Sequence, residues 1–105
     1  MRKLLFIISS DPRTSARPAE AIRIAAGVSA WGRAAVSICL VGPAVLMLSE
    51  GDQPLKDESQ FASGLPLVSK PIYVMNTSAP VADAQVVSVR GLAQLALRHD
   101  AVVRF

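Results

Sequence analysis

The sequence predicts a small α/β domain with a short, mostly parallel sheet, and three observations predict it. The chain has 105 residues, its apolar run at 4–8 is continuous, and a helical pattern separates this run from a second, largely apolar run at 35–41. Continuous apolar runs are typical of strands that are covered on both faces, as in parallel sheets. A chain of this length has room for one hydrophobic core, so we expect a single domain over residues 1–105.

The first half of the chain predicts a strand, a helix and a second strand. Residues 4–8 form the first strand, and Pro18 suits the first turn of the helix that follows, where its missing N–H costs nothing. That helix ends at Gly32, and its polar stripe consists of Glu20, Arg23 and Gly27. Residues 35–41 form the second strand and complete a strand-helix-strand unit, whose crossover is right-handed in nearly all proteins.

The second half predicts shorter elements. A short helix is expected over 43–48, whereas the segment 51–70 carries the weakest pattern because glycine and proline interrupt it. The remaining elements are a strand at 71–75, a loop at 76–83, a helix at 88–99 and a strand at 101–105. On this last helix, a solvent stripe repeats every four residues opposite an apolar face; the stripe is Arg90, Gln94 and Arg98, and the face is Val89, Leu92 and Ala96.

The composition favours a cytoplasmic protein that associates with other chains. Hydrophobic residues make up 51% of the chain and the mean hydropathy is +0.40, so a domain this small will expose apolar surface that association would cover. No apolar run approaches the ~20 residues that a membrane span needs. The single cysteine, Cys39, excludes an internal disulfide framework and a cysteine-based zinc site, and without an export signal it fits a reducing compartment.

The charge distribution argues against nucleic acid as a partner. The formal net charge is +3 and the pI is about 9.6, but the basic residues are scattered without a dense run or interleaved aromatic residues. An acidic patch lies midway along the chain, at Glu50, Asp52, Asp57 and Glu58. Nucleic-acid-binding domains concentrate their positive charge on one face or helix, so we expect neither nucleic acid nor a membrane as partner.

The best candidate site lies beyond the carboxyl ends of the strands, where parallel sheets bind their ligands. The loop 9–17 combines hydroxyls and guanidiniums with the exposed amides at the start of the next helix, and this combination favours a small anion. The predicted ligand-binding residues are Ser9, Ser10, Arg13, Thr14, Ser15, Arg17, Gly42, Asn76, Thr77 and Ser78. The alternative is ordinary turn and capping chemistry, for which serine, aspartate and proline are typical. No glycine-rich nucleotide fingerprint is present, and we expect no cofactor and no metal.

Two further residues carry chemistry that the sequence does not connect to this loop. Cys39 lies within an apolar strand, where burial raises the pKa of a thiol and makes it inert. His99 ends the last helix and is expected to interact with the helix C-terminus rather than act as a base. Because His99 leads into the last strand, we expect it at the opposite end of the sheet from the loop 9–17. A third hypothesis, hydrolysis or group transfer by the Ser78 hydroxyl with a neighbouring base, is therefore disfavoured, because the only histidine would lie away from that serine.

Several phrases of the sequence are similar to those of a known family. They are the opening KLLFIISS at 3–10, an alanine-rich first helix, the phrase GPAV at 42–45 and the ending at 92–105. Together they resemble the DsrE/DsrF-like family, which includes the TusD-type proteins of sulfur relay. The resemblance covers nearly the whole chain and implies a flavodoxin-like three-layer α/β/α sandwich with a sheet of four or five strands. It also implies a homo-oligomer, with a trimer or hexamer expected, or assembly with a related subunit.

The chain departs from this family at its reactive residue. Active members carry a persulfide on a cysteine in the loop that follows the strand at 72–75, and here that loop reads Asn76-Thr77-Ser78. The residue that matches the cysteine is Ser78, whose hydroxyl cannot hold a persulfide. We therefore expect a noncatalytic DsrE-like protein, either a multimer-forming subunit or a small-ligand binder. The alternative is a sulfurtransferase that carries persulfide on Cys39, which requires an exposed thiol with a depressed pKa.

Overall fold

A computed structural model describes residues 1–48, 55–56, 61, 63–75 and 84–105. Its centre is a five-stranded sheet in the order β4-β3-β2-β1-β5, with every neighbouring pair parallel. The strands are β1 (Arg2–Ile8), β2 (Ala34–Val41), β3 (Ile72–Met75), β4 (Ala84–Val87) and β5 (Ala101–Arg104). The predicted parallel α/β sheet is therefore confirmed, with the larger of the two expected strand numbers.

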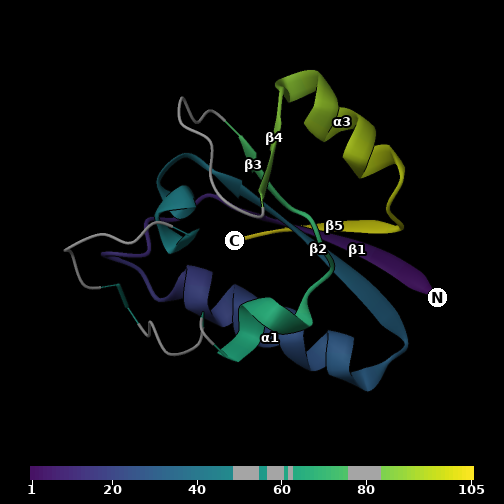
Figure 1. The fold of residues 1–105 in the computed structure, drawn as a ribbon, viewed down its shortest axis with the longest axis horizontal. Helices are drawn as coiled ribbons and strands as arrows, with labels where there is room; N and C mark the ends of the chain where they lie inside the picture. Colours follow the sequence, from purple (N-terminus) through teal and green to yellow (C-terminus); the bar gives the residue numbers. More distant parts are fainter. Residues whose placement is uncertain (49–54, 57–60, 62, 76–83) are drawn as a thin grey trace.

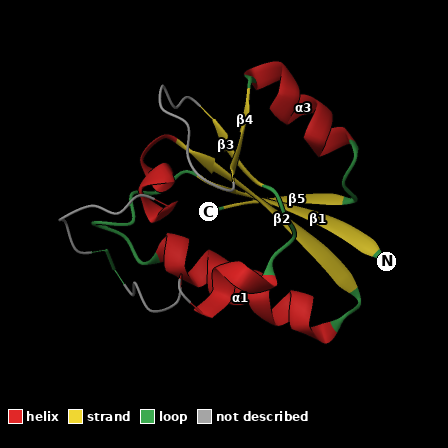
Figure 2. Ribbon diagram, viewed as in Figure 1, coloured by secondary structure: helices red, strands yellow, loops and turns green. Residues whose placement is uncertain are grey.

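Helices cover the two faces of this sheet and give the three layers (Figure 1). The helix α1 (Arg17–Trp31) lies on one face, and α3 (Val89–Leu97) lies on the other (Figure 2). Two 3-10 helices, η1 (Gly42–Leu48) and η2 (Leu65–Leu67), complete the described elements. The predicted helix boundary at Gly32 is confirmed, because this residue ends α1 at a φ of 79°, a left-handed conformation that glycine adopts at little cost.

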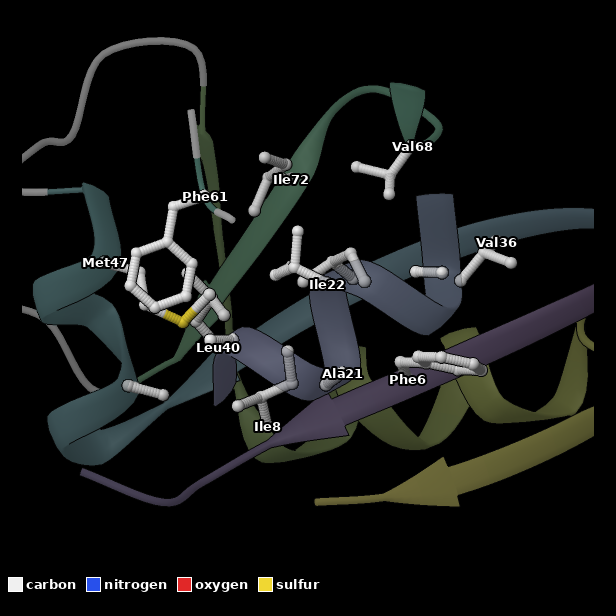
Figure 3. Packing of buried hydrophobic residues seen from close by; sticks show 14 of the residues in the cluster. Phe6, Ile8, Ala21, Ile22, Val36, Leu40, Met47, Phe61, Val68 and Ile72 are labelled. Atoms are coloured by element: carbon white, nitrogen blue, oxygen red, sulfur yellow. The ribbon is translucent and has the colours of Figure 1, made fainter. Parts of the chain in front are cut away.

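The main core fills the space between the sheet and α1. Side chains of β1, β2 and β3 pack against those of α1 and η1 there, and Phe61 and Val68 are buried in the same cluster (Figure 3). The buried face of α1 includes Ala21 and Ile22, whereas its predicted polar stripe is exposed. The chain before η2 approaches α1 closely, since a Cβ atom placed on Gly64 would lie 2.5 Å from Cγ2 of Ile22.

The opposite face of the sheet has a much smaller core. Its buried members are Leu5, Ile7, Cys39 and Leu95, and Leu95 is the one fully buried residue among those of α3. The predicted apolar face of α3 was wrong at Val89, which is 73% exposed, because the buried line of the helix runs through Leu92, Leu95 and Ala96. The predicted solvent stripe of α3 is exposed, as expected.

One strand was missed by the sequence analysis. Strand β4 contains four residues, AQVV, and pairs with β3 at the sheet edge. Neither a continuous apolar run nor an alternating pattern marks so short a segment, and it directly precedes Ser88, the N-cap of α3. The expected loop at 76–83 lies outside the described residues.

Candidate functional site

The predicted loop occupies the edge of the sheet where ligand sites of parallel sheets lie. Ser9 follows β1 and Gly42 follows β2, so both lie at the carboxyl edge. The sheet order reverses between β1 and β5, and the backbone N–H of Ser9 donates to the carbonyl oxygen of Phe105 at this point, at 3.0 Å. The Ser9 hydroxyl donates to the same oxygen at 3.4 Å. The loop therefore begins at the topological switch point, which is the expected place for a site.

Most of the loop's polar groups bond to one another. The Asp11 carboxylate accepts hydrogen bonds from the backbone N–H and the guanidinium of Arg13. The Asp11 carbonyl accepts from the backbone N–H groups of Thr14 and Ser15, and the Ser15 hydroxyl accepts from the backbone N–H of Arg17 at 3.1 Å. This is the turn and capping chemistry that the sequence left open as the alternative.

The charges of the loop partly cancel. The ion pair between Arg13 Nη2 and Asp11 Oδ2 is 2.8 Å long, and the hydrogen bonds from Arg13 lower the pKa of the Asp11 carboxyl below its ordinary value. Arg17 is exposed at the first turn of α1, whose N-cap residue, Ala16, provides no side-chain cap. The positive field for an anion at this edge therefore comes mainly from Arg17 and the start of α1.

The remaining predicted site residues have different outcomes. Gly42 has a φ of 59°, a conformation that favours glycine and turns the chain from β2 into η1. Ser10 and Thr14 belong to the same loop as the Asp11 turn. The other three predicted ligand-binding residues, Asn76, Thr77 and Ser78, lie outside the described residues.

Cys39 does not meet the requirements of a persulfide carrier. Its side chain is buried in the small core beneath α3, and burial raises the pKa of the thiol from 9.0 to about 11. At neutral pH the thiol is protonated and has no access to solvent. The inert structural role predicted for this residue is therefore supported, and the alternative of an exposed, low-pKa thiol is not.

A pocket lies at the opposite, amino edge of the sheet, where the sequence predicted no site. This pocket has a volume of about 240 Å³ and lies between the starts of β1, β2 and β3 and the end of α3. Its polar lining residues are Lys3, Ser37, Ser69, Tyr73, Arg98 and His99. These residues come from five separate segments, so no sequence spacing could have revealed them as a group.

His99 joins two elements at this pocket. Its Nδ1 atom lies 2.6 Å from the carbonyl oxygen of Leu95, which confirms the predicted contact with the end of α3. Its Nε2 atom lies 3.1 Å from Oγ of Ser37 in β2, a partner that the sequence analysis missed. A carbonyl oxygen only accepts, so Nδ1 donates to Leu95, and in the tautomer with its proton on Nδ1 the Nε2 atom accepts from the Ser37 hydroxyl.

No group of three histidine, cysteine, aspartate or glutamate side chains is placed to hold a metal ion in the described part of the chain. No helix among those residues has the length and apolar character to cross a membrane.

The fold defines a class of protein, the small α/β domains built on a five-stranded, wholly parallel sheet with its order reversing beside β1. Within this class, the chain is similar to the YchN protein from E. coli, a protein of DsrE-like fold, whose crystal structure it matches with a TM-score of 0.79. The match covers 100% of both chains at 19% sequence identity. No family model matches the chain, and a search of curated proteins found no match. The structural likeness supports the DsrE-like fold that the sequence predicted.

Proposed function

We propose that this protein is a noncatalytic subunit of a homo-oligomer, and that it associates through the outer face of α3. The observation that carries the proposal is an apolar stripe on the solvent side of this helix. Val89, Ala93 and Leu97 recur at every fourth position, so they lie along one line of the helix. All three are exposed, and the exposed fractions of Val89 and Leu97 are 73% and 87%.

The surroundings of the stripe favour the same interpretation. The neighbouring strand β5 exposes Val102, whose exposed fraction is 41% and whose register partner Leu5 belongs to the small core beneath α3. Tyr73, Met75 and Val87, on the sheet face that α3 covers, are shielded only in part. Apolar groups gathered on one side of a small domain are typical of a surface that another chain covers. A second copy would bury this surface without requiring another gene product.

The noncatalytic part of the proposal rests on the chain's only cysteine. Because Cys39 is buried and its pKa is raised, it offers no thiolate for sulfur transfer. Incubation with a small persulfide donor, followed by intact mass spectrometry, should show no added sulfur atom on the folded protein. A persulfide found on Cys39 would contradict this part of the proposal and would favour the alternative of a sulfurtransferase.

The oligomer is tested by native mass spectrometry and sedimentation velocity on the whole chain. We expect a homo-oligomer at micromolar concentration, and the substitution Leu97→Lys should convert it to monomer because it places a charge in the stripe. The matched control is Leu67→Lys, which changes a residue that is 55% exposed on the α1 side of the molecule. A monomeric wild-type protein, or an oligomer that survives Leu97→Lys, would refute the proposed interface.

A ligand at the carboxyl edge completes the proposal. The start of α1 and the exposed Arg17 favour a small oxyanion beside Ser10 and Thr14. Titration with inorganic phosphate, followed by the backbone amide signals of this loop, should give weaker binding in Arg17→Gln. Binding should be tighter in Asp11→Asn, which removes the negative charge of the Asp11 carboxylate from the loop. Arg23→Gln, farther along α1, is the control for net charge, and equal effects of the Arg17 and Arg23 substitutions would exclude a site here.

A further inference from the structure

We infer that the pocket at the amino edge of the sheet binds a small organic anion, with a carboxylate or phosphate group and a hydrogen-bonding group beside it. The pocket was described above by its geometry, and the proposed oligomer and the carboxyl-edge ligand make no use of it. Parallel α/β sheets usually bind ligands at the other edge. The residues that line this pocket therefore decide which ligand it can hold.

The charge of the lining selects an anion. Lys3 lies near the start of β1 and Arg98 is the C-cap residue of α3, so two cations from different elements border the same space. No aspartate or glutamate is among the residues that line the pocket. The nearby carboxylate of Asp100 accepts a hydrogen bond from the backbone N–H of Lys3 at 2.6 Å. A carboxylate or phosphate can take charge-assisted hydrogen bonds from both cations.

The end of α3 does not oppose this charge strongly. The C-terminal carbonyls of a helix carry partial negative charge, which disfavours an anion nearby. Here the Leu95 carbonyl accepts from the backbone N–H of Arg98 and lies 2.6 Å from Nδ1 of His99. The Ala96 carbonyl accepts from the backbone N–H of His99. Because these acceptors already have donors, the pocket retains the positive character given by its side chains.

The hydroxyl groups of the lining select a ligand that also forms neutral hydrogen bonds. Ser37, Ser69 and Tyr73 all border the pocket, and in the His99 tautomer with its proton on Nδ1 the contact with Nε2 engages the proton of the Ser37 hydroxyl. The Ser37 oxygen is then an acceptor for a ligand hydroxyl or amine, while Ser69 and Tyr73 can donate or accept. Leu95 and Ala35 supply apolar lining. The volume of about 240 Å³ is below the range of about 300–1,000 Å³ for drug-sized ligands, so the ligand is small.

The Ser37–His99 pair is assigned to binding rather than to hydrolysis. A serine nucleophile needs donors that stabilise the oxyanion, and these are commonly free backbone N–H groups at a turn or helix start. Ser37 lies inside β2 and pairs with Leu5 of β1, where backbone groups are used in the sheet ladder. If a serine-directed fluorophosphonate modified Ser37 in the folded protein, the assignment to binding would be overturned.

The test uses side chains that occur once in the chain. His99 is the only histidine and Tyr73 the only tyrosine, so their ring signals in NMR spectra report on this pocket without further assignment. We expect both rings to shift with saturation on titration with lactate or inorganic phosphate at millimolar concentration. Propane-1,2-diol, which is lactate with its carboxylate replaced by an alcohol, should leave the rings unchanged. Equal shifts with the diol, or no shift with either anion, would overturn the inference.

Variants connect the signal to the two cations. Arg98→Gln or Lys3→Gln should weaken lactate binding about tenfold, because each removes one charge-assisted hydrogen bond. The control is Arg90→Gln, which makes the same charge change two turns earlier on α3, at an exposed position outside the pocket lining. Equal weakening by Arg98→Gln and Arg90→Gln would show a general charge effect and contradict the site. The oligomer measured for Leu97→Lys is a separate readout, so the two proposals fail independently.

Discussion

The hydroxyl of Ser37 lies 3.1 Å from Nε2 of His99, although 62 positions separate the two residues in sequence. This contact connects the middle of the sheet to the turn between α3 and β5. Since the imidazole also contacts the Leu95 carbonyl, His99 holds the end of the helix against β2. The α3 side of the molecule has a small core, so a polar contact is a larger part of its attachment than on the α1 side.

A double-mutant cycle should measure this contact. Ser37→Ala, His99→Asn and the double variant would be unfolded with urea at a pH near 8, where a free imidazole is neutral. A hydrogen bond between partly buried neutral groups contributes about 1 kcal/mol to the free energy of unfolding, so we expect a coupling of that size. Additive effects of the two substitutions would show that the pair does not hold α3 in place.

Two glycines should respond with opposite signs to substitution by alanine. Gly27 lies on the exposed side of α1 and has nothing within 4 Å of an added Cβ, so Gly27→Ala should stabilise the protein by about 0.5–1 kcal/mol. At Gly64 the added Cβ would meet the fully buried side chain of Ile22, and we expect a loss of about 1–3 kcal/mol. Thermal unfolding followed by circular dichroism compares the two. Stabilisation by Gly64→Ala would show that this segment does not pack on α1 as described.

The capping of α3 gives a third prediction. The Ser88 hydroxyl accepts a hydrogen bond from the backbone N–H of Gly91 at 3.0 Å, which satisfies a donor at the helix start. Ser88→Ala should therefore lower the free energy of unfolding by about 1 kcal/mol, whereas Ser88→Asn should preserve most of it. Urea unfolding monitored by circular dichroism measures both. If the asparagine variant lost as much stability as the alanine variant, the cap would not be the cause.

The strongly patterned elements could be predicted from sequence because local physics determines them. The run at 4–8 is apolar throughout, the run at 35–41 is apolar except at Ser37, and the two lie within β1 and β2. Pro18 and Gly32 mark the ends of α1 as expected. Strand β4 has no such marker, since four residues at a sheet edge carry too short a pattern. Its place beside β3 depends on a pairing that only the tertiary structure fixes.

The candidate sites were less predictable than the fold. The position of the loop 9–17 could be predicted because parallel sheets bind ligands at the carboxyl ends of their strands. The hydrogen bonds within the loop could not, because they depend on the conformation of the Asp11 side chain. For His99, the sequence predicted the contact with the end of α3, although the helix ends at Leu97 rather than at His99, and it excluded the carboxyl edge. The sequence did not predict the contact between Ser37 and His99. The register of β2 and the packing of α3 together bring the Ser37 hydroxyl to the His99 imidazole, and both are fixed only in the tertiary structure.

Cys39 gives a prediction of pH dependence whose sign follows from burial. The pKa of its thiol rises from 9.0 to about 11 in the folded protein, so between these values the unfolded chain has lost the proton that the folded chain retains. The unfolded state then binds fewer protons, and stability falls as the pH rises through this window. Against a variant without the thiol, we expect a relative loss of about 2 kcal/mol by the upper end of the window.

The measurement is urea unfolding of the wild type and of Cys39→Ala at a series of pH values from about 8 to 10.5. Lysine and tyrosine groups also titrate there, but they occur in both proteins, so their contributions largely cancel in the difference. At neutral pH, Cys39→Ala costs stability because it removes buried volume beneath α3. The gap between the two proteins should narrow steadily as the pH rises. Parallel curves would mean that the thiol ionises in the folded state as readily as in the unfolded chain, and would reopen the possibility that Cys39 reacts.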